Sequence, residues 1–67
     1  MYIIKIQGSN KIPDYVQIRD DQFKLIAYFK VHSPKRALER CGLALKADAI
    51  MDIVSQLPYG QIRELDL

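Results

Sequence analysis

The segment Phe23–Val31 constrains the fold of this chain more than any other part of the sequence. Its odd-numbered positions are all apolar, whereas its even-numbered positions read Lys, Ile, Tyr and Lys. Alternation of this kind is the signature of a β-strand with one face in a hydrophobic core. The even face mixes cations with an isoleucine and a tyrosine, so it is neither plainly solvated nor plainly buried. We expect the functional information to lie on that second face.

Three shorter segments also have strand patterns: residues 2–7, 15–19 and 61–66. In the first of them we expect the face with Ile4 and Ile6 to point into the core, because it carries more apolar side chains. Residues 8–14 contain mostly residues that favour turns, and they predict a loop.

The second and third strands are close enough in sequence to form a hairpin. Asp20-Asp21 follows residues 15–19 directly and is the expected connection to the strand that contains the alternating segment. Aspartate tolerates left-handed backbone better than most residues, so a tight two-residue turn is expected.

A helical period replaces the strand period after Val31. Ser33 can cap the first free amides of a helix, and Pro34 suits its first position. Gly42 can end that short helix in the left-handed conformation. From Leu43 to Leu57 apolar residues recur at three- and four-residue steps, which predicts a second, amphipathic helix of about four turns.

The order strand, strand, strand, helix, helix, strand predicts an α+β fold with a small antiparallel sheet and a helix pair packed on one face. With 67 residues, the chain is expected to form a single compact domain, residues 1–67. The expected core consists of Ile4, Ile6, Val16, Ile18, Leu25, Ala27, Phe29, Leu38, Ile50, Val54, Leu57 and Ile62.

Residues with reactive side chains are few. His32 is the only histidine and Cys41 the only cysteine, and neither has a nucleophile or base signature around it. One of each is too few for a metal site, and residues 8–11 lack the second glycine and Lys-Ser/Thr pair of a phosphate loop. We therefore expect no enzyme activity, no metal, no cofactor and no small-molecule ligand.

The single cysteine excludes an intrachain disulfide, which fits a reducing compartment. The first apolar run is too short for a signal peptide, and no run approaches the roughly 20 apolar residues that span a bilayer. A cytoplasmic protein without membrane contact is expected.

The outward side of the predicted sheet is the remaining candidate for function. It is expected to carry four cations among aromatic and aliphatic side chains: Lys5, Arg19, Lys24 and Lys30 with Tyr15, Tyr28, Ile3 and Ile26. Tyrosines and lysine stems suit a protein interface. Cations interleaved with aromatic rings also suit single-stranded nucleic acid, and the mildly basic net charge of +2 is compatible with it. A third possibility is a solvated face whose lysines prevent edge pairing.

These observations favour a non-catalytic protein-interaction module, either a homodimer or a subunit of a larger complex. A single-stranded nucleic-acid-binding domain is the alternative, and its affinity would fall steeply as salt rises. The residues expected to form the binding surface are Tyr15, Arg19, Lys24, Ile26, Tyr28 and Lys30. No motif in the chain identifies its partner.

Overall fold

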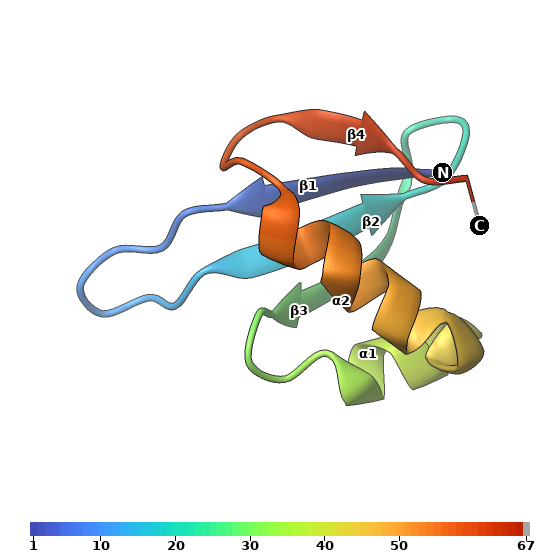
Figure 1. The fold of residues 1–67 in the computed structure, drawn as a ribbon, viewed down its shortest axis with the longest axis horizontal. Coiled ribbons are helices and arrows are strands. Elements are labelled where there is room, and N and C mark those ends of the chain that lie inside the picture. Colours follow the sequence, from blue (N-terminus) through green and yellow to red (C-terminus); the bar gives the residue numbers. More distant parts are fainter. Residues whose placement is uncertain (67) are drawn as a thin grey trace.

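The computed structural model describes residues 1–66; Leu67, the last residue of the predicted domain, lies outside the described residues. An antiparallel sheet of four strands has the order β3-β2-β1-β4, and the helices pack against one of its faces (Figure 1). The predicted α+β fold is therefore confirmed. The strands are β1 (Tyr2–Ile6), β2 (Tyr15–Arg19), β3 (Leu25–Lys30) and β4 (Ile62–Glu64).

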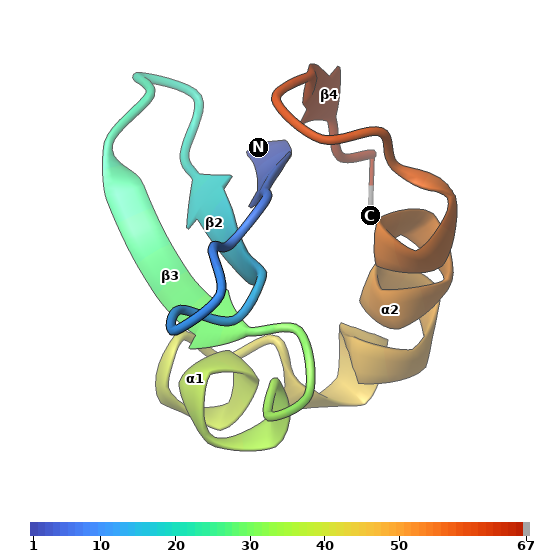
Figure 2. The same cartoon turned by 90° about the vertical axis from the view of Figure 1, so that its left-hand side faces the viewer.

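Two helices form the second layer. Helix α1 (Lys35–Arg40) lies beside β3, and helix α2 (Ala47–Gln56) lies towards β4, so both occupy the same side of the curved sheet (Figure 2). A 3-10 turn (Ala44–Lys46) leads directly into α2, which makes the second helix close to the predicted length.

The ends of α1 were predicted in part. The amide of Gly42 donates to Glu39 and the amide of Leu43 donates to Leu38, with Gly42 at φ +80°. This pair of bonds is the Schellman arrangement that a glycine favours, as expected. The Ser33 cap is wrong: no side chain caps α1, and Pro34 precedes the helix with its carbonyl accepting the Leu38 amide.

The face of β1 that points inward is the opposite of the predicted one. Ile3 pairs with Ile18 and is 1% exposed, whereas Ile4 and Ile6 are only partly buried on the other face. Lys5 shares the inward face with Ile3, and its Nζ donates to the carbonyl of Val54 at 2.9 Å. That carbonyl belongs to the last turn of α2, where a cation is favourable. This hydrogen bond to the helix end offsets the cost of placing the Lys5 ammonium on the inward face. A prediction based on the number of apolar residues on each face therefore selects the wrong one.

A bulge at the start of β3 explains a second error. Ile18 pairs with Ala27 but Arg19 pairs with Leu25, so Ile26 has no partner of its own. The extra residue reverses the alternation, and Leu25 lies opposite Arg19 instead of on the core face with Ala27.

The last strand also turns its isoleucine outward. Ile62 pairs with Ile4 and therefore shares the face of Ile4, away from the helices. Leu65, just beyond β4, is buried in its place, and its amide donates to the carbonyl of Met1. The prediction placed Ile62 in the core and did not include Leu65. A strand of three residues is too short for its alternation to show which face points inward.

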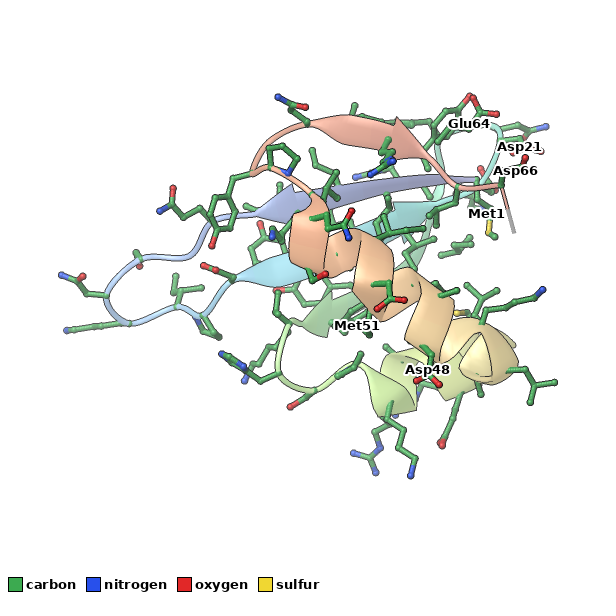
Figure 3. All side chains as sticks on the ribbon, in the orientation of Figure 1. Met1, Asp21, Asp48, Met51, Glu64 and Asp66 are labelled. Atoms are coloured by element: carbon green, nitrogen blue, oxygen red, sulfur yellow. The ribbon has the colours of Figure 1, made fainter. Side chains whose placement is uncertain are left out.

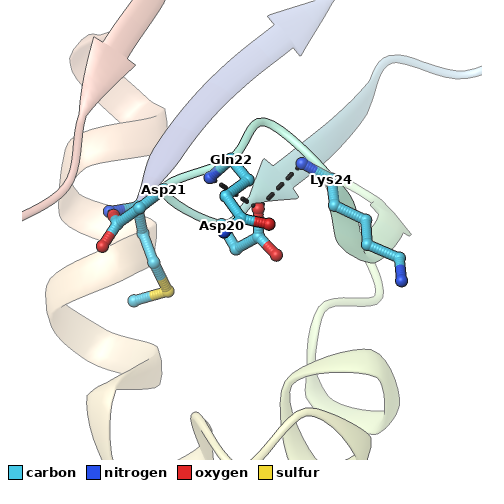
Figure 4. Close-up of polar contacts among 5 residues, drawn as sticks. Asp20, Asp21, Gln22 and Lys24 are labelled. Atoms are coloured by element: carbon cyan, nitrogen blue, oxygen red, sulfur yellow. Dashed lines mark hydrogen bonds and ion pairs between the residues drawn. The ribbon is translucent and has the colours of Figure 1, made fainter.

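The β2–β3 hairpin is confirmed, but its turn is longer than two residues. The Asp20 carboxylate accepts hydrogen bonds from the amides of Gln22 and Lys24, which wraps the chain around it (Figure 4). Phe23 adopts the left-handed conformation at φ 65°, and β3 begins only at Leu25. Aspartate side chains often organise turns in this way. Asp21 points elsewhere and pairs with the amino group of Met1 at 2.7 Å.

The hydrophobic core fills the space between the sheet and the two helices. Eight of the twelve predicted core residues are buried there, and Ile4, Ile6, Leu25 and Ile62 are not. The buried apolar residues are Ile3, Val16, Ile18, Ala27, Phe29, Leu38, Ile50, Val54, Leu57 and Leu65.

Candidate functional site

The sheet face that points away from the helices forms a continuous surface, which we call the outer face. Residues directly opposite one another on neighbouring strands lie on the same face, so the register defines its composition. Three rows cross the sheet from β3 towards β4: Lys30, Tyr15 and Ile6; then Tyr28, Gln17, Ile4 and Ile62; then Leu25, Arg19, Tyr2 and Glu64.

No helix among residues 1–66 covers the outer face, and three of its large apolar side chains are open while the others are partly buried (Figure 2). Tyr28 and Ile62 are 54% and 55% exposed, and Leu25 is 45% exposed. Isolated surface hydrophobics are ordinary, but a contiguous patch on a small protein marks an interaction surface.

Aromatic contacts stabilise the β3 side of this surface. The rings of Tyr15 and Tyr28 have centroids 4.9 Å apart. Phe23, from the turn, lies edge-on to Tyr2 at 5.9 Å and under the guanidinium of Arg19 at 4.7 Å. Such pairs hold ring positions before any partner arrives, which lowers the ordering cost of binding.

The cations of the outer face are fewer than predicted. Lys5 lies on the helix side of the sheet, and Ile3 lies in the core, so both were wrongly assigned to this surface. Arg19 is already bonded within the chain: it donates to the Gln17 side chain and to the Phe23 carbonyl, both at 3.0 Å. Lys30 is exposed at the β3 edge, and Glu64, whose side chain is labelled in Figure 3, is exposed on β4 opposite Tyr2 of β1.

The predicted surface residues are therefore brought together only in part. Tyr15, Arg19, Tyr28 and Lys30 share the outer face, with Tyr15 directly opposite Lys30. Ile26 lies at the bulge, and Lys24 belongs to the turn, where its amide bonds to Asp20. A role in binding stays a prediction for all six residues.

Several outer-face residues were missed because they were expected inside. These are Ile4, Ile6, Leu25 and Ile62; Tyr2 and Phe23, which were assigned to neither the core nor the binding surface, were missed as well. The doubled apolar pattern of β1, with isoleucines on both faces, was the signal that the second face is apolar as well. The outer face is thus less cationic and more hydrophobic than the sequence suggested.

A polar cluster lies where the chain leaves α2. The Tyr59 hydroxyl and the Gly8 amide both donate to the Asp14 carboxylate, and the Lys5 ammonium lies 5.0 Å from the centre of the Tyr59 ring. The Tyr59 hydrogen bond and then the Gly8 amide lower the pKa of Asp14 below its ordinary 3.8. The same bond to Asp14 raises the pKa of Tyr59 above 10.0. These contacts fasten the segment before β4 to the β1–β2 loop.

The two residues with potential for chemistry have unremarkable surroundings. His32 is exposed in the turn after β3, and Cys41 is half-buried, with its Sγ 3.5 Å from the carbonyl oxygen of Leu38. Throughout the described part of the chain, no group of three or more His, Cys, Asp or Glu side chains is placed to hold a metal ion.

Comparison of the chain with protein-family models, with curated proteins and with solved structures finds no match. Among residues 1–66, neither helix has the length and apolar character needed to cross a bilayer.

Proposed function

We propose that this chain is a small, non-catalytic protein-interaction module that pairs with a second copy of itself through the outer face. The observation that carries the proposal is the open, apolar outer face on a sheet whose other side is already sealed by helices. A chain of this size gains little stability from one small core, so burial of a second apolar surface has a clear energetic benefit.

A second copy is favoured over an unrelated partner because the outer face is complementary to itself. A two-fold axis parallel to the strands places β3 of one copy over β4 of the other. Each row of side chains then packs against the same row of the second copy, running in the opposite direction across the sheet. Tyr28 therefore lies over Ile62 of the second copy. These are the two most exposed large apolar side chains of the face. Glu64 of the second copy lies over Leu25, one strand away from Arg19, so these opposite charges are diagonal neighbours across the interface.

The dimensions of the face predict a weak dimer. Four strands spaced about 4.8 Å apart, each of about five residues, give roughly 300 Å² in projection. Side-chain relief and the flanking Phe23 raise the total area buried by two copies to about 1,000 Å², the low end for specific interfaces. We therefore expect a micromolar dissociation constant and a two-sheet sandwich with aligned strands.

A single-stranded nucleic acid is the second candidate. The adjacent Tyr15 and Tyr28 rings, tilted by 46° to each other beside Lys30, favour it, since bases stack on such rings next to a phosphate contact. Two observations weigh against it: Lys5 points to the helices, and the Arg19 guanidinium is already bonded to Gln17 and Phe23.

A cytoplasmic location completes the proposal. Cys41 is a free thiol, and its Sγ donates a hydrogen bond to the backbone carbonyl of Leu38. A small domain stabilised by packing and not by disulfides suits a reducing compartment.

Sedimentation equilibrium over a range of concentrations tests the proposal. The wild-type chain should associate reversibly with a micromolar dissociation constant, and Ile62→Lys should weaken association about tenfold or more by placing a charge in the apolar contact. Leu45→Lys is the matched control, because Leu45 is fully exposed in the 3-10 turn on the helix side. A wild-type chain that stays monomeric at hundreds of micromolar, or equal weakening by both variants, would contradict the proposal.

A further inference from the structure

Strand β3 is an open edge of the sheet. It pairs with β2 on one side, and no strand among residues 1–66 pairs with its other side. The amide of Val31 donates to the backbone carbonyl of Asp14, and the amide of Asp20 donates to the carbonyl of Lys24, which fixes the alternation along this antiparallel pair. Ala27 and Phe29 therefore direct their backbone groups to β2, whereas Tyr28 directs its N–H and C=O outward.

A groove runs along this open edge, between β3 and α1. Its volume is about 490 Å³, and its floor and walls come from the β3 residues 26–30, from Ser33, and from one stripe of α1. Arg36, Ala37 and Arg40 form that stripe because positions three and four apart share one side of a helix. The small Ala37 side chain leaves room between the two arginines. The outward backbone groups of Tyr28 thus border a preformed channel.

The charged residues of the groove all have the same sign. Lys30, Arg36 and Arg40 line it, and no acidic residue does. All three side chains are exposed, and none of them is in an ion pair within the part of the chain that the structure describes. Three unpaired cations around an open strand edge select for an anionic occupant.

We propose that this groove binds an extended acidic segment of another protein, added as a further antiparallel or parallel strand alongside β3. Main-chain hydrogen bonds to the outward N–H and C=O of Tyr28 would supply affinity that is independent of sequence. Alternate side chains of the added strand would point towards α1, so acidic residues at those positions would meet Arg36 and Arg40. The intervening side chains would lie beside the Tyr28 ring.

A second copy of this chain does not suit the groove. Pairing of two β3 edges would bring Lys30, Arg36 and Arg40 of both copies to one seam, and like charges at close range disfavour that contact. Ile62, the residue changed in the dimer variant, lies on the opposite edge strand, whereas Tyr28 and Lys30 border both surfaces, so the groove is tested at concentrations at which the chain is monomeric. Failure of one proposal therefore leaves the other testable.

Fluorescence anisotropy with a designed probe tests the groove. The probe is a labelled peptide of alternating valine and glutamate with six residues, the length of β3. Two companion probes carry lysine in place of glutamate, or the same acidic sequence with its backbone nitrogens methylated on one edge. We expect saturable binding of the acidic probe alone, since the lysine probe has the wrong charge and the methylated probe cannot pair as a strand.

Charge reversal on α1 supplies the matched variants. Arg36→Glu combined with Arg40→Glu should weaken the acidic probe about tenfold or more. Lys35→Glu, a reversal on the same helix but beside Glu39 and away from the groove, should change affinity less than about twofold. Ile62→Lys should leave probe binding unchanged. In hydrogen-exchange measurements, the acidic probe should slow exchange of the Tyr28 amide.

The proposal would be overturned by equal binding of the acidic and lysine probes, or by undiminished binding of the methylated probe. Equal losses from the groove variant and from Lys35→Glu would overturn it as well. So would binding of a single-stranded oligonucleotide at the groove when no peptide binds.

Discussion

Conservative truncation of two adjacent isoleucines in β1 distinguishes the observed sheet register from its alternative. Ile3 is 1% exposed in the core, whereas Ile4 is partly buried on the outer face. The variants Ile3→Val and Ile4→Val remove the same methylene group from neighbouring positions. Their free energies of unfolding should therefore differ only because the two side chains have different surroundings.

The expected magnitudes follow from burial. Loss of a fully buried methylene costs about 0.8 kcal/mol in transfer free energy, and a residual cavity raises the cost of Ile3→Val to about 1 kcal/mol. The partly exposed Ile4 loses a fraction of that, about 0.4 kcal/mol or less. For a domain of this size, Ile3→Val should lower Tm by about 5 °C, and Ile4→Val by about 2 °C or less.

Urea and thermal unfolding followed by far-UV circular dichroism suit the measurement, since the chain has no tryptophan. Protein concentrations well below the dimer dissociation constant keep outer-face contacts from contributing to stability. A larger cost for Ile4→Val than for Ile3→Val would refute the register, because it would place Ile4 in the core and Lys5 outside.

Three further perturbations probe other parts of the fold. Phe29→Ala, in the core, should cost about 3–5 kcal/mol and abolish the cooperative melt; a transition near that of the wild type would count against the core assignment. The lowered pKa of Asp14 means that its contribution to stability is present above pH 3.8 and is lost as the pH falls through the folded-state value. Tyr59→Phe should therefore reduce the acid-side fall in urea midpoint, and an unchanged profile would exclude the contact. Gly8→Ala should destabilise by about 2 kcal/mol, because its Cβ would lie 1.9 Å from the Ile12 carbonyl oxygen; an unshifted Tm would contradict that close approach.

Strand and helix order were predictable because β2, the part of β3 after its bulge and the two helices carry clear periods. Val16 and Ile18 alternate with polar residues, and both are buried as expected. In β1 the pattern reads Tyr-Ile-Ile-Lys-Ile, so either face could be the inner one. The choice depends on a contact remote in sequence, between the Lys5 ammonium and the carbonyl of Val54 at the end of α2. Local periodicity contains no information on that contact.

The candidate surface, like the fold, was predictable only in part. Alternation alone places Tyr15 and Tyr28 on one face, and they do lie together there. The bulge at Ile26 could not be read from the sequence, because it arises from the Asp20-centred turn and reverses the side on which Leu25 lies. The basic groove was missed entirely. Arg36 and Arg40 belong to a helix whose position beside β3 is a property of the packed fold.

The most direct measurement of the central claim is a dilution series followed by methyl and amide NMR. If the outer face pairs with a second copy, signals of Ile62, Ile4 and Tyr28 should shift with concentration through the micromolar range, while those of Leu45 stay fixed. Spectra that do not change with concentration, or shifts confined to the helix layer, would contradict the account.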